Sequence, residues 1–136
     1  MAKVTFVGFQ EKVEIPAGFQ LLQINESIQS AKSRDDLFSL ISDSQKLSLW
    51  LFDVESFDSR PGGKLLFTNA SQATCTSFLL GKEVSLISEY FGNFTGKVVK
   101  GKTENSIHIK FEILTDDVES KSDEILEILK RLTLQL

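Results

Sequence analysis

Cysteine and histidine occur once each among the 136 residues of the sequence, and proline occurs only twice. A single cysteine, Cys75, cannot form an intrachain disulfide, so the sequence gives no sign of an oxidising compartment. We expect its thiol to be a small buried apolar group. Zinc sites are built mainly from cysteine and histidine, and Cys75 and His108 fall on separate predicted strands without ligand spacing. The sequence therefore predicts no metal site, and nothing in it indicates a cofactor.

Long apolar runs are also missing. The apolar start of the chain ends at Phe9, because Gln10, Glu11 and Lys12 interrupt it before the core of a signal peptide could form. No later stretch approaches the ~20 apolar residues that a membrane-spanning helix needs. We therefore expect a cytoplasmic protein that does not insert into a membrane.

Positive charge is scarce as well, since the formal net charge is −4. Binding to nucleic acid requires a basic surface that displaces counterions from phosphates, so the sequence argues against a nucleic-acid partner. Lys97, Lys100 and Lys102 form a local basic cluster around Gly101. Their spacing indicates a solvated hairpin tip, and a site for a phosphate or an acidic partner is the minor alternative.

What the sequence does contain is a globular composition, 41% hydrophobic and 25% charged. A chain of this length buries roughly two-thirds of its extended-chain surface, so we expect residues 1–136 to form one domain. Strands are predicted at residues 19–30, 51–57, 64–68, 74–80, 82–91, 94–100 and 104–114. Further strands are predicted at 4–9 and 12–15, in an N-terminal segment (1–18) whose place in the sheet the pattern leaves open. The predicted turns at residues 61–63, 69–71, 81, 92–93 and 101–102 are too tight for anything but antiparallel neighbours.

Two short helical segments interrupt the strands. Ser33 followed by Asp36 has the spacing of a capping box, and an apolar helical stripe follows it. Ser44 can cap a second helical segment that runs through Leu47 and Trp50. The pair predicts a helix–turn–helix too short to be stable without packing on a sheet.

The end of the chain has the clearest patterns. At residues 107–113 apolar and polar side chains alternate, which predicts a strand with one face in the core and one in water. At residues 116–136 an apolar stripe recurs at helical spacing and predicts a long amphipathic helix. The stripe contains Ile125, Ile128, Leu129, Leu132 and Leu136.

Two strings, "ISDSQKLSLW" at 41–50 and "FDSRPGGKLLF" at 57–67, resemble the activator of heat-shock-protein-ninety ATPase homologue family. That family belongs to the START-like (SRPBCC, polyketide cyclase or birch-pollen-allergen) superfamily. The most specific element is the turn Arg60, Pro61, Gly62 and Gly63, in which proline sets φ and the glycines permit positive φ. The resemblance implies an α+β helix-grip fold. In this fold a curved antiparallel sheet wraps around a long C-terminal helix, and two short helices follow the first strand.

Three local features could carry chemistry, and each has a simpler structural interpretation. The glycines at 62–63 lead into a strand, whereas a phosphate loop leads into a helix. His108 lies on the polar face of a predicted strand, which favours an exposed structural residue. Asp53, Glu55 and Asp58 favour a solvated strand edge, because a general acid needs a desolvated carboxyl group. We assign no catalytic residue and expect binding more than catalysis.

Eleven phenylalanines dominate the aromatic residues. Core packing accounts for them, since each buried phenylalanine contributes roughly 1.5–3 kcal/mol. The resemblance implies a further role, because START-like domains keep an apolar cavity between the sheet and the last helix, which suits lipids or aromatic small molecules. Our first hypothesis is therefore a binding module for an apolar small molecule. Its candidate wall residues are Phe38, Trp50, Phe67, Phe78, Tyr90, Phe111, Ile125, Ile128, Leu129 and Leu132.

Two alternatives follow from the same resemblance. One is a co-chaperone-type protein-interaction domain that regulates a heat-shock chaperone ATPase through its surface. The other, less favoured, is an enzyme of the cyclase or hydrolase type, which would require an ionisable group inside the cavity.

Overall fold

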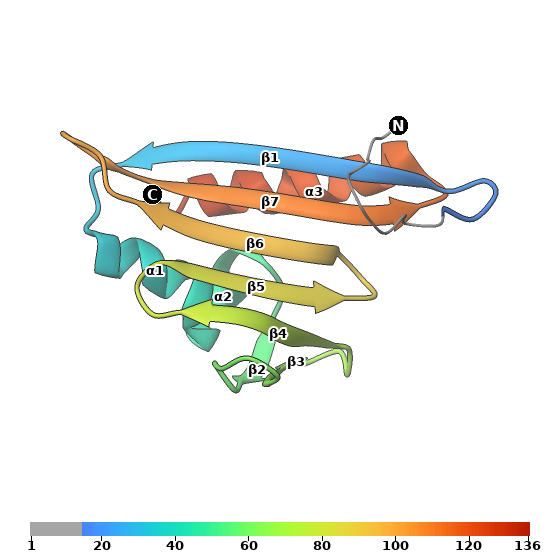
Figure 1. Cartoon of the computed structure of the whole chain (residues 1–136), viewed down its shortest axis with the longest axis horizontal. Coiled ribbons are helices and arrows are strands. Elements are labelled where there is room, and N and C mark those ends of the chain that lie inside the picture. Colours follow the sequence, from blue (N-terminus) through green and yellow to red (C-terminus); the bar gives the residue numbers. More distant parts are fainter. Residues whose placement is uncertain (1–14) are drawn as a thin grey trace, which may run out of the picture.

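The computed structural model describes residues 15–136, which form an antiparallel sheet with helices on one of its faces (Figure 1). The strands are β1 (Gln20–Ser30), β2 (Val54–Phe57), β3 (Lys64–Phe67), β4 (Gln72–Leu79), β5 (Glu83–Ser88), β6 (Gly92–Val99) and β7 (Asn105–Thr115). The helices are α1 (Arg34–Ser42), α2 (Ser44–Trp50) and α3 (Val118–Thr133). The strand order is β1-β7-β6-β5-β4-β3-β2, so β1 and β2 form the edges. The α+β class, the curved antiparallel sheet and the three helices confirm the expected architecture.

The start of the described chain is a turn that leads into β1. The Phe19 N–H donates to the Pro16 carbonyl at 3.0 Å. Gly18 has a φ of 84°, which favours glycine. The strands predicted at residues 4–9 and 12–15 lie outside the described residues, except for Ile15, which is not in a strand.

The turn between β5 and β6 differs from the prediction. β5 ends at Ser88 and the turn occupies residues 89–91, whereas the sequence pattern placed the strand end at 91 and the turn at 92–93. Phe91 explains the difference, because its ring is buried in the core although its backbone belongs to the turn. A hydrophobic turn residue of this kind looks like a strand residue in a sequence pattern.

Side-chain caps fix the starts of the short helices. Ser33 caps α1 as predicted, and its hydroxyl accepts a hydrogen bond from the Asp36 N–H at 3.1 Å. The cap of α2 is Asp43 and not Ser44, since the Asp43 carboxylate accepts from the Gln45 N–H at 3.0 Å. The two helices therefore follow one another with a single residue between them.

The strands divide their side chains between an inner face, covered by the helices, and an outer face on the opposite side of the sheet. β7 shows the division most clearly: Ile107, Ile109, Phe111 and Ile113 are buried, whereas His108 and Lys110 are exposed. Hydrophobic burial thus fixes which side of every neighbouring strand faces the core.

The terminal helix α3 packs on the inner face against β1 and β7. Its buried side chains are Ile125, Ile128, Leu129 and Leu132. Arg131 anchors the helix to the end of α2, because its guanidinium donates to the carbonyls of Trp50 at 3.1 Å and Leu51 at 3.2 Å. These two bonds satisfy carbonyl groups that the end of α2 leaves without helical partners.

The turn at residues 60–63 connects β2 to β3 and is held by backbone hydrogen bonds. The Gly63 N–H donates to the Arg60 carbonyl at 2.8 Å, and the Gly62 N–H donates to the Cys75 carbonyl at 2.7 Å. Gly62 has a φ of 85°. A Cβ at Gly63 would lie 1.9 Å from the Asp58 carbonyl oxygen. Glycine is therefore favoured at both positions after Pro61, but for different reasons. Gly62 adopts a positive φ, and at Gly63 the backbone of another residue approaches closely.

We expect Ile128→Asp to lower the free energy of unfolding by about 3–5 kcal/mol, because it places a charge against the core. Ile128 is 3% exposed, whereas Leu126 on the same helix is 51% exposed. Leu126→Asp is the matched control and should change stability by less than about 0.5 kcal/mol. Urea denaturation followed by circular dichroism measures both. Equal midpoints for the two variants would contradict the packing of α3 described here.

We expect Gly63→Ala to cost about 3 kcal/mol or more, since its methyl group would overlap a backbone carbonyl. Gly81→Ala is the control: Gly81 also lies in a turn, with φ 78°, and a Cβ there meets nothing within 4 Å. Its left-handed backbone should cost only about 1–2 kcal/mol. Thermal melting of both variants tests this. A Gly63→Ala protein as stable as Gly81→Ala would show that the turn relaxes freely.

Candidate functional site

The residues predicted to line a cavity come together in the core, with two exceptions. Phe38, Trp50, Phe67, Phe111, Ile125, Ile128, Leu129 and Leu132 belong to one buried cluster. Phe78 is half-buried and packs against that cluster, and Tyr90 is exposed at the β5–β6 turn. The proximity of eight of the ten is established, and their role as the wall of a ligand site stays a prediction.

Aromatic rings pack against one another between the helices and the sheet in the described chain. Phe94 lies at the centre, with ring centroids 5.9 Å from Trp50, 5.2 Å from Phe111 and 6.4 Å from Phe91. The Trp50 indole N–H donates to the Leu40 carbonyl at 2.8 Å, which fixes the ring. Phe91 and Phe94 were missing from the predicted wall. Phe94 and Gly96 are both buried and face inward on β6. The alternation along this strand was therefore a signal that could have identified Phe94 as a core residue.

The aromatic cluster reaches the surface near the start of α3. Phe52 stacks on Tyr90 with centroids 4.8 Å apart, and it lies 6.4 Å from Phe91. The Lys121 ammonium lies 4.8 Å from the centre of the Tyr90 ring and donates to the Tyr90 carbonyl at 3.3 Å. It also pairs with Glu124 at 2.9 Å. These contacts cover the outer end of the aromatic cluster.

The outer face presents a different surface, organised in rows across the strands. In one row Ser27 of β1 pairs with His108 of β7, His108 pairs with Lys97 of β6, and Lys97 pairs with Glu83 of β5. In the next row Asn25, Lys110, Thr95 and Ser85 follow in the same strand order. Paired residues in an antiparallel sheet point to the same side, so both rows project away from the core.

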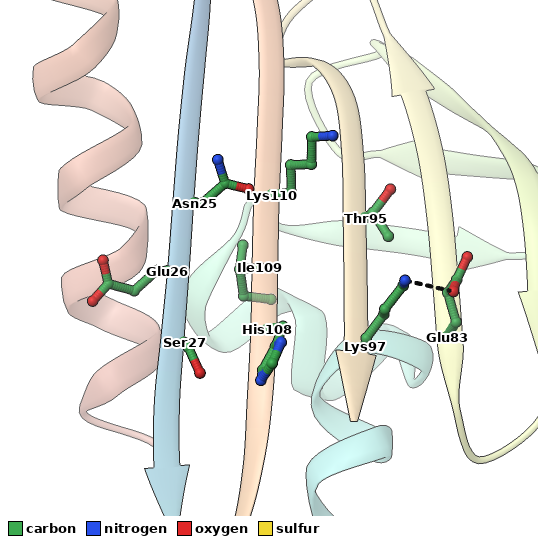
Figure 2. A pocket seen from close by; sticks show the side chains of 9 residues that line it. All are labelled: Asn25, Glu26, Ser27, Glu83, Thr95, Lys97, His108, Ile109 and Lys110. Atoms are coloured by element: carbon green, nitrogen blue, oxygen red, sulfur yellow. Dashed lines mark ion pairs between the residues drawn. The ribbon is translucent and has the colours of Figure 1, made fainter. Parts of the chain in front are cut away.

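A hollow of about 580 Å³ lies over these two rows, and we name it the polar hollow (Figure 2). It is lined by Asn25, Glu26, Ser27, Glu83, Thr95, Lys97, His108, Ile109 and Lys110. Sequence patterns place His108 and Lys110 on a polar strand face. They do not place Ser27 and Lys97 beside His108, because that contact depends on strand register.

The ion pairs beside the polar hollow are long, and they join exposed lysines to half-buried carboxylates. The Lys97 ammonium lies 3.7 Å from the Glu83 carboxylate, and Lys110 lies 3.6 Å from Glu112. Both distances exceed the range of a hydrogen bond, and such exposed pairs contribute little to stability. Glu112 instead accepts a hydrogen bond from the Gln23 amide at 2.6 Å.

Two further hollows, of about 410 and 750 Å³, lie beside one another at the other end of the outer face. They share Ile87, Ser88 and Glu89 of β5 and the turn that follows it. Ile87 is 45% exposed, and Leu114 of β7, which lines the smaller hollow, is 39% exposed. We name this region the apolar end of the outer face.

The described residues show little that supports catalysis. The His108 ring forms a hydrogen bond with the Ser106 hydroxyl at 3.3 Å on the open sheet surface. Burial raises the pKa of the Cys75 thiol, which favours the unreactive protonated form. Asp53, Glu55 and Asp58 are exposed. Among residues 15–136, no three His, Cys, Asp or Glu side chains are placed to hold a metal ion, and no helix is long and apolar enough to cross a membrane.

Comparisons with known proteins identify the fold. No protein-family model and no curated protein matches the sequence. The Mll3558 protein from Rhizobium loti is similar in structure, with 14% identity, a TM-score of 0.66 and coverage of 87% of this chain and 99% of its own. CalU16 from Micromonospora echinospora has 13% identity, a TM-score of 0.63 and coverage of 82% and 74%. The Aha1 dimer from Colwellia psychrerythraea has 10% identity, a TM-score of 0.58 and coverage of 80% and 92%.

The chain has the START-like helix-grip fold. Identities this low show the fold alone. The resemblance of the two strings to the heat-shock ATPase activator homologues therefore stays a prediction at the level of the family, although the fold that it implied is confirmed.

Proposed function

We propose that this START-like domain is a binding domain that engages another protein through the outer face of its sheet. The proposal rests on the location of the open hollows between side chains. Between α3 and the sheet the described side chains pack against one another, whereas the hollows described above lie on the outer face. Close aromatic packing among the described interior residues, together with open hollows on the outer face, supports a surface-binding domain over a cavity-binding one.

The composition of the outer face supports the same proposal. Ile87 and Leu114 expose apolar surface at the apolar end, and polar and charged side chains make up most of the lining of the polar hollow. Protein interfaces commonly combine an apolar centre with a polar, solvated rim. The Aha1 neighbour was solved as a dimer, so one protein of similar fold makes a protein–protein contact.

In the experiment, the parent chain is used to capture a partner protein from an extract of the cells in which it naturally occurs. We expect the double variant Ile87→Arg, Leu114→Arg to lose that partner. Two arginines would replace apolar contacts at the centre of the interface, so capture should fall about tenfold or more. Quantitative mass spectrometry of the captured proteins measures the difference.

The control is Leu126→Arg, which introduces one arginine at an exposed apolar site of α3, away from the sheet surface. It should capture the partner as the parent does. The proposal fails if the outer-face variant keeps every partner, or if the α3 variant loses the same partners, while circular dichroism shows both variants folded.

An apolar small molecule in the helix grip is the second candidate, and one observation favours it. Phe52 and Tyr90 connect the surface to the buried rings of Phe91 and Phe94, so a ligand that displaced them would reach the core. The enzyme alternative has less support, because the buried polar side chains of the described chain are Ser30, Ser88 and Thr115.

We expect fatty acids, flavonoids and sterols to leave the fluorescence of Trp50 unchanged, because the rings around it already occupy the space. Trp50 is the only indole and contacts Phe94, so it would report a ligand in the grip. Titrations at low and high salt with calorimetry test this. Saturable binding below about millimolar that does not depend on salt would favour the small-molecule function instead.

A further inference from the structure

The end of the sheet at which β1, β4 and β6 finish is rich in lysine, and we name it the basic end. Three connecting segments lie there, residues 31–33, 80–82 and 100–104, and the last of them projects farthest (Figure 1, left). Each segment carries one or two exposed lysines, which are Lys32, Lys82, Lys100 and Lys102. The carboxylate within these segments is that of Glu104.

Hydrogen bonds hold the three segments beside one another. The Asn105 side-chain amide donates to the Lys32 carbonyl at 3.0 Å, and the Val98 N–H donates to the Lys82 carbonyl at 2.8 Å. The segments extend over the five adjacent strands from β1 to β4, a width of roughly 19 Å. The lysines are therefore spread over a broad surface.

The other charges at this end do not cancel the lysines. Glu83 faces Lys97 across the strands, with an ammonium–carboxylate distance of 3.7 Å. At the start of α1, Arg34 is followed by Asp35 and Asp36. Together these groups add one negative charge more than they neutralise, so the basic end keeps an excess of positive charge on a chain whose formal net charge is −4.

The opposite end of the sheet is acidic. Its connecting segments, residues 16–19, 68–71, 89–91 and 116–117, contain no lysine or arginine, and their carboxylates belong to Glu89, Asp116 and Asp117. Lys121 of α3 reaches this end, but it is paired with Glu124. The chain is thus polarised along its strands, so a negatively charged surface attracts one end and repels the other.

The basic end also exposes apolar side chains. Leu80 is 83% exposed, and its neighbours Leu79 and Val99 are 52% and 39% exposed. A tight turn presents Leu80, because the Lys82 N–H donates to the Leu79 carbonyl at 2.8 Å and Gly81 has a φ of 78°. Apolar side chains surrounded by lysines suit a membrane surface, which buries the former at the headgroup boundary and binds the latter through anionic lipids.

We propose that the basic end docks on the surface of a bilayer that contains anionic phospholipid. Lys82, Lys100 and Lys102 bind lipid phosphates and carboxylates, and Leu80 enters the headgroup region. The contact is peripheral and leaves the outer face free, with Ile87 near the acidic end. The inference goes beyond the proposed function and does not depend on it.

The test is co-sedimentation of the parent chain with vesicles of phosphatidylcholine and phosphatidylserine, and with vesicles of phosphatidylcholine alone. Binding is expected to the mixed vesicles, and high salt should weaken it. The double variant Lys82→Gln, Lys102→Gln should bind the mixed vesicles about tenfold more weakly, because each lysine near an anionic surface adds to the attraction.

The matched control is Lys64→Gln, Lys110→Gln, which makes the same change in net charge at exposed lysines of β3 and β7. It should bind the mixed vesicles as the parent does. Equal losses in the two double variants would overturn the proposal, because they would indicate attraction to the whole chain. Equal binding of the parent to both kinds of vesicle, or to neither, would also overturn it.

Leu80→Ser distinguishes a membrane from other polyanions. It should lower binding to the mixed vesicles about fivefold, whereas Leu126→Ser on α3 should leave binding unchanged. Both side chains are exposed, so circular dichroism should show both variants folded. Unchanged vesicle binding by Leu80→Ser would overturn the proposal, and so would soluble poly-glutamate that binds the parent as tightly as the vesicles do.

The result is independent of the capture experiment, because these variants keep Ile87 and Leu114. If the vesicles bind as expected but the Ile87→Arg, Leu114→Arg variant keeps every partner, the membrane contact stands and the proposed function fails. If that variant loses its partner and the vesicles do not bind, the proposed function stands and the membrane contact fails.

Discussion

The packing of α3 on the inner face of the sheet is the interaction on which the rest of the structure depends. Four apolar side chains of α3 are buried against a sheet whose strands alternate between core and solvent. Once α3 covers one face, the alternation fixes the composition of the other: every inward isoleucine of β7 has a polar neighbour that points outward. The polar rows of the outer face are therefore a consequence of the same pattern that builds the core.

The way in which the core is filled also limits the function. In a helix-grip fold the sheet curves around the terminal helix, and the size of the enclosed side chains decides whether a cavity remains. Here Trp50, Phe91, Phe94 and Phe111 are all fully buried and lie edge to face or tilted against one another. A ligand that entered among these rings would have to displace their packing, which costs free energy. Surface binding carries no such cost.

Sequence patterns predicted the elements whose period is maintained over a long run. β7 and α3 each repeat one spacing over three or more turns or pleats, so their type and buried face were predictable. The patterns were less reliable at Phe91, whose backbone lies in a turn while its ring is buried in the core. The polar hollow was not predictable for a different reason. Its residues meet through the register of β1, β7, β6 and β5, and hydrophobic alternation sets the face of a residue but not its neighbours across strands.

The proposed binding through the outer face of the sheet agrees with how the edges of the described sheet are protected. An unpaired strand edge is a template for another strand, and proteins protect it with short strands, bulges or inward-pointing charges. β2 has four residues and a register shift between Val54 and Ser56. β1 is longer, but Glu26 occupies an inward-facing position between Ile24 and Ile28, where it leaves a charge beside the helix. Such a charge at the edge disfavours the addition of another strand. The outer face of the described sheet carries no such obstacle, in agreement with the proposed surface binding.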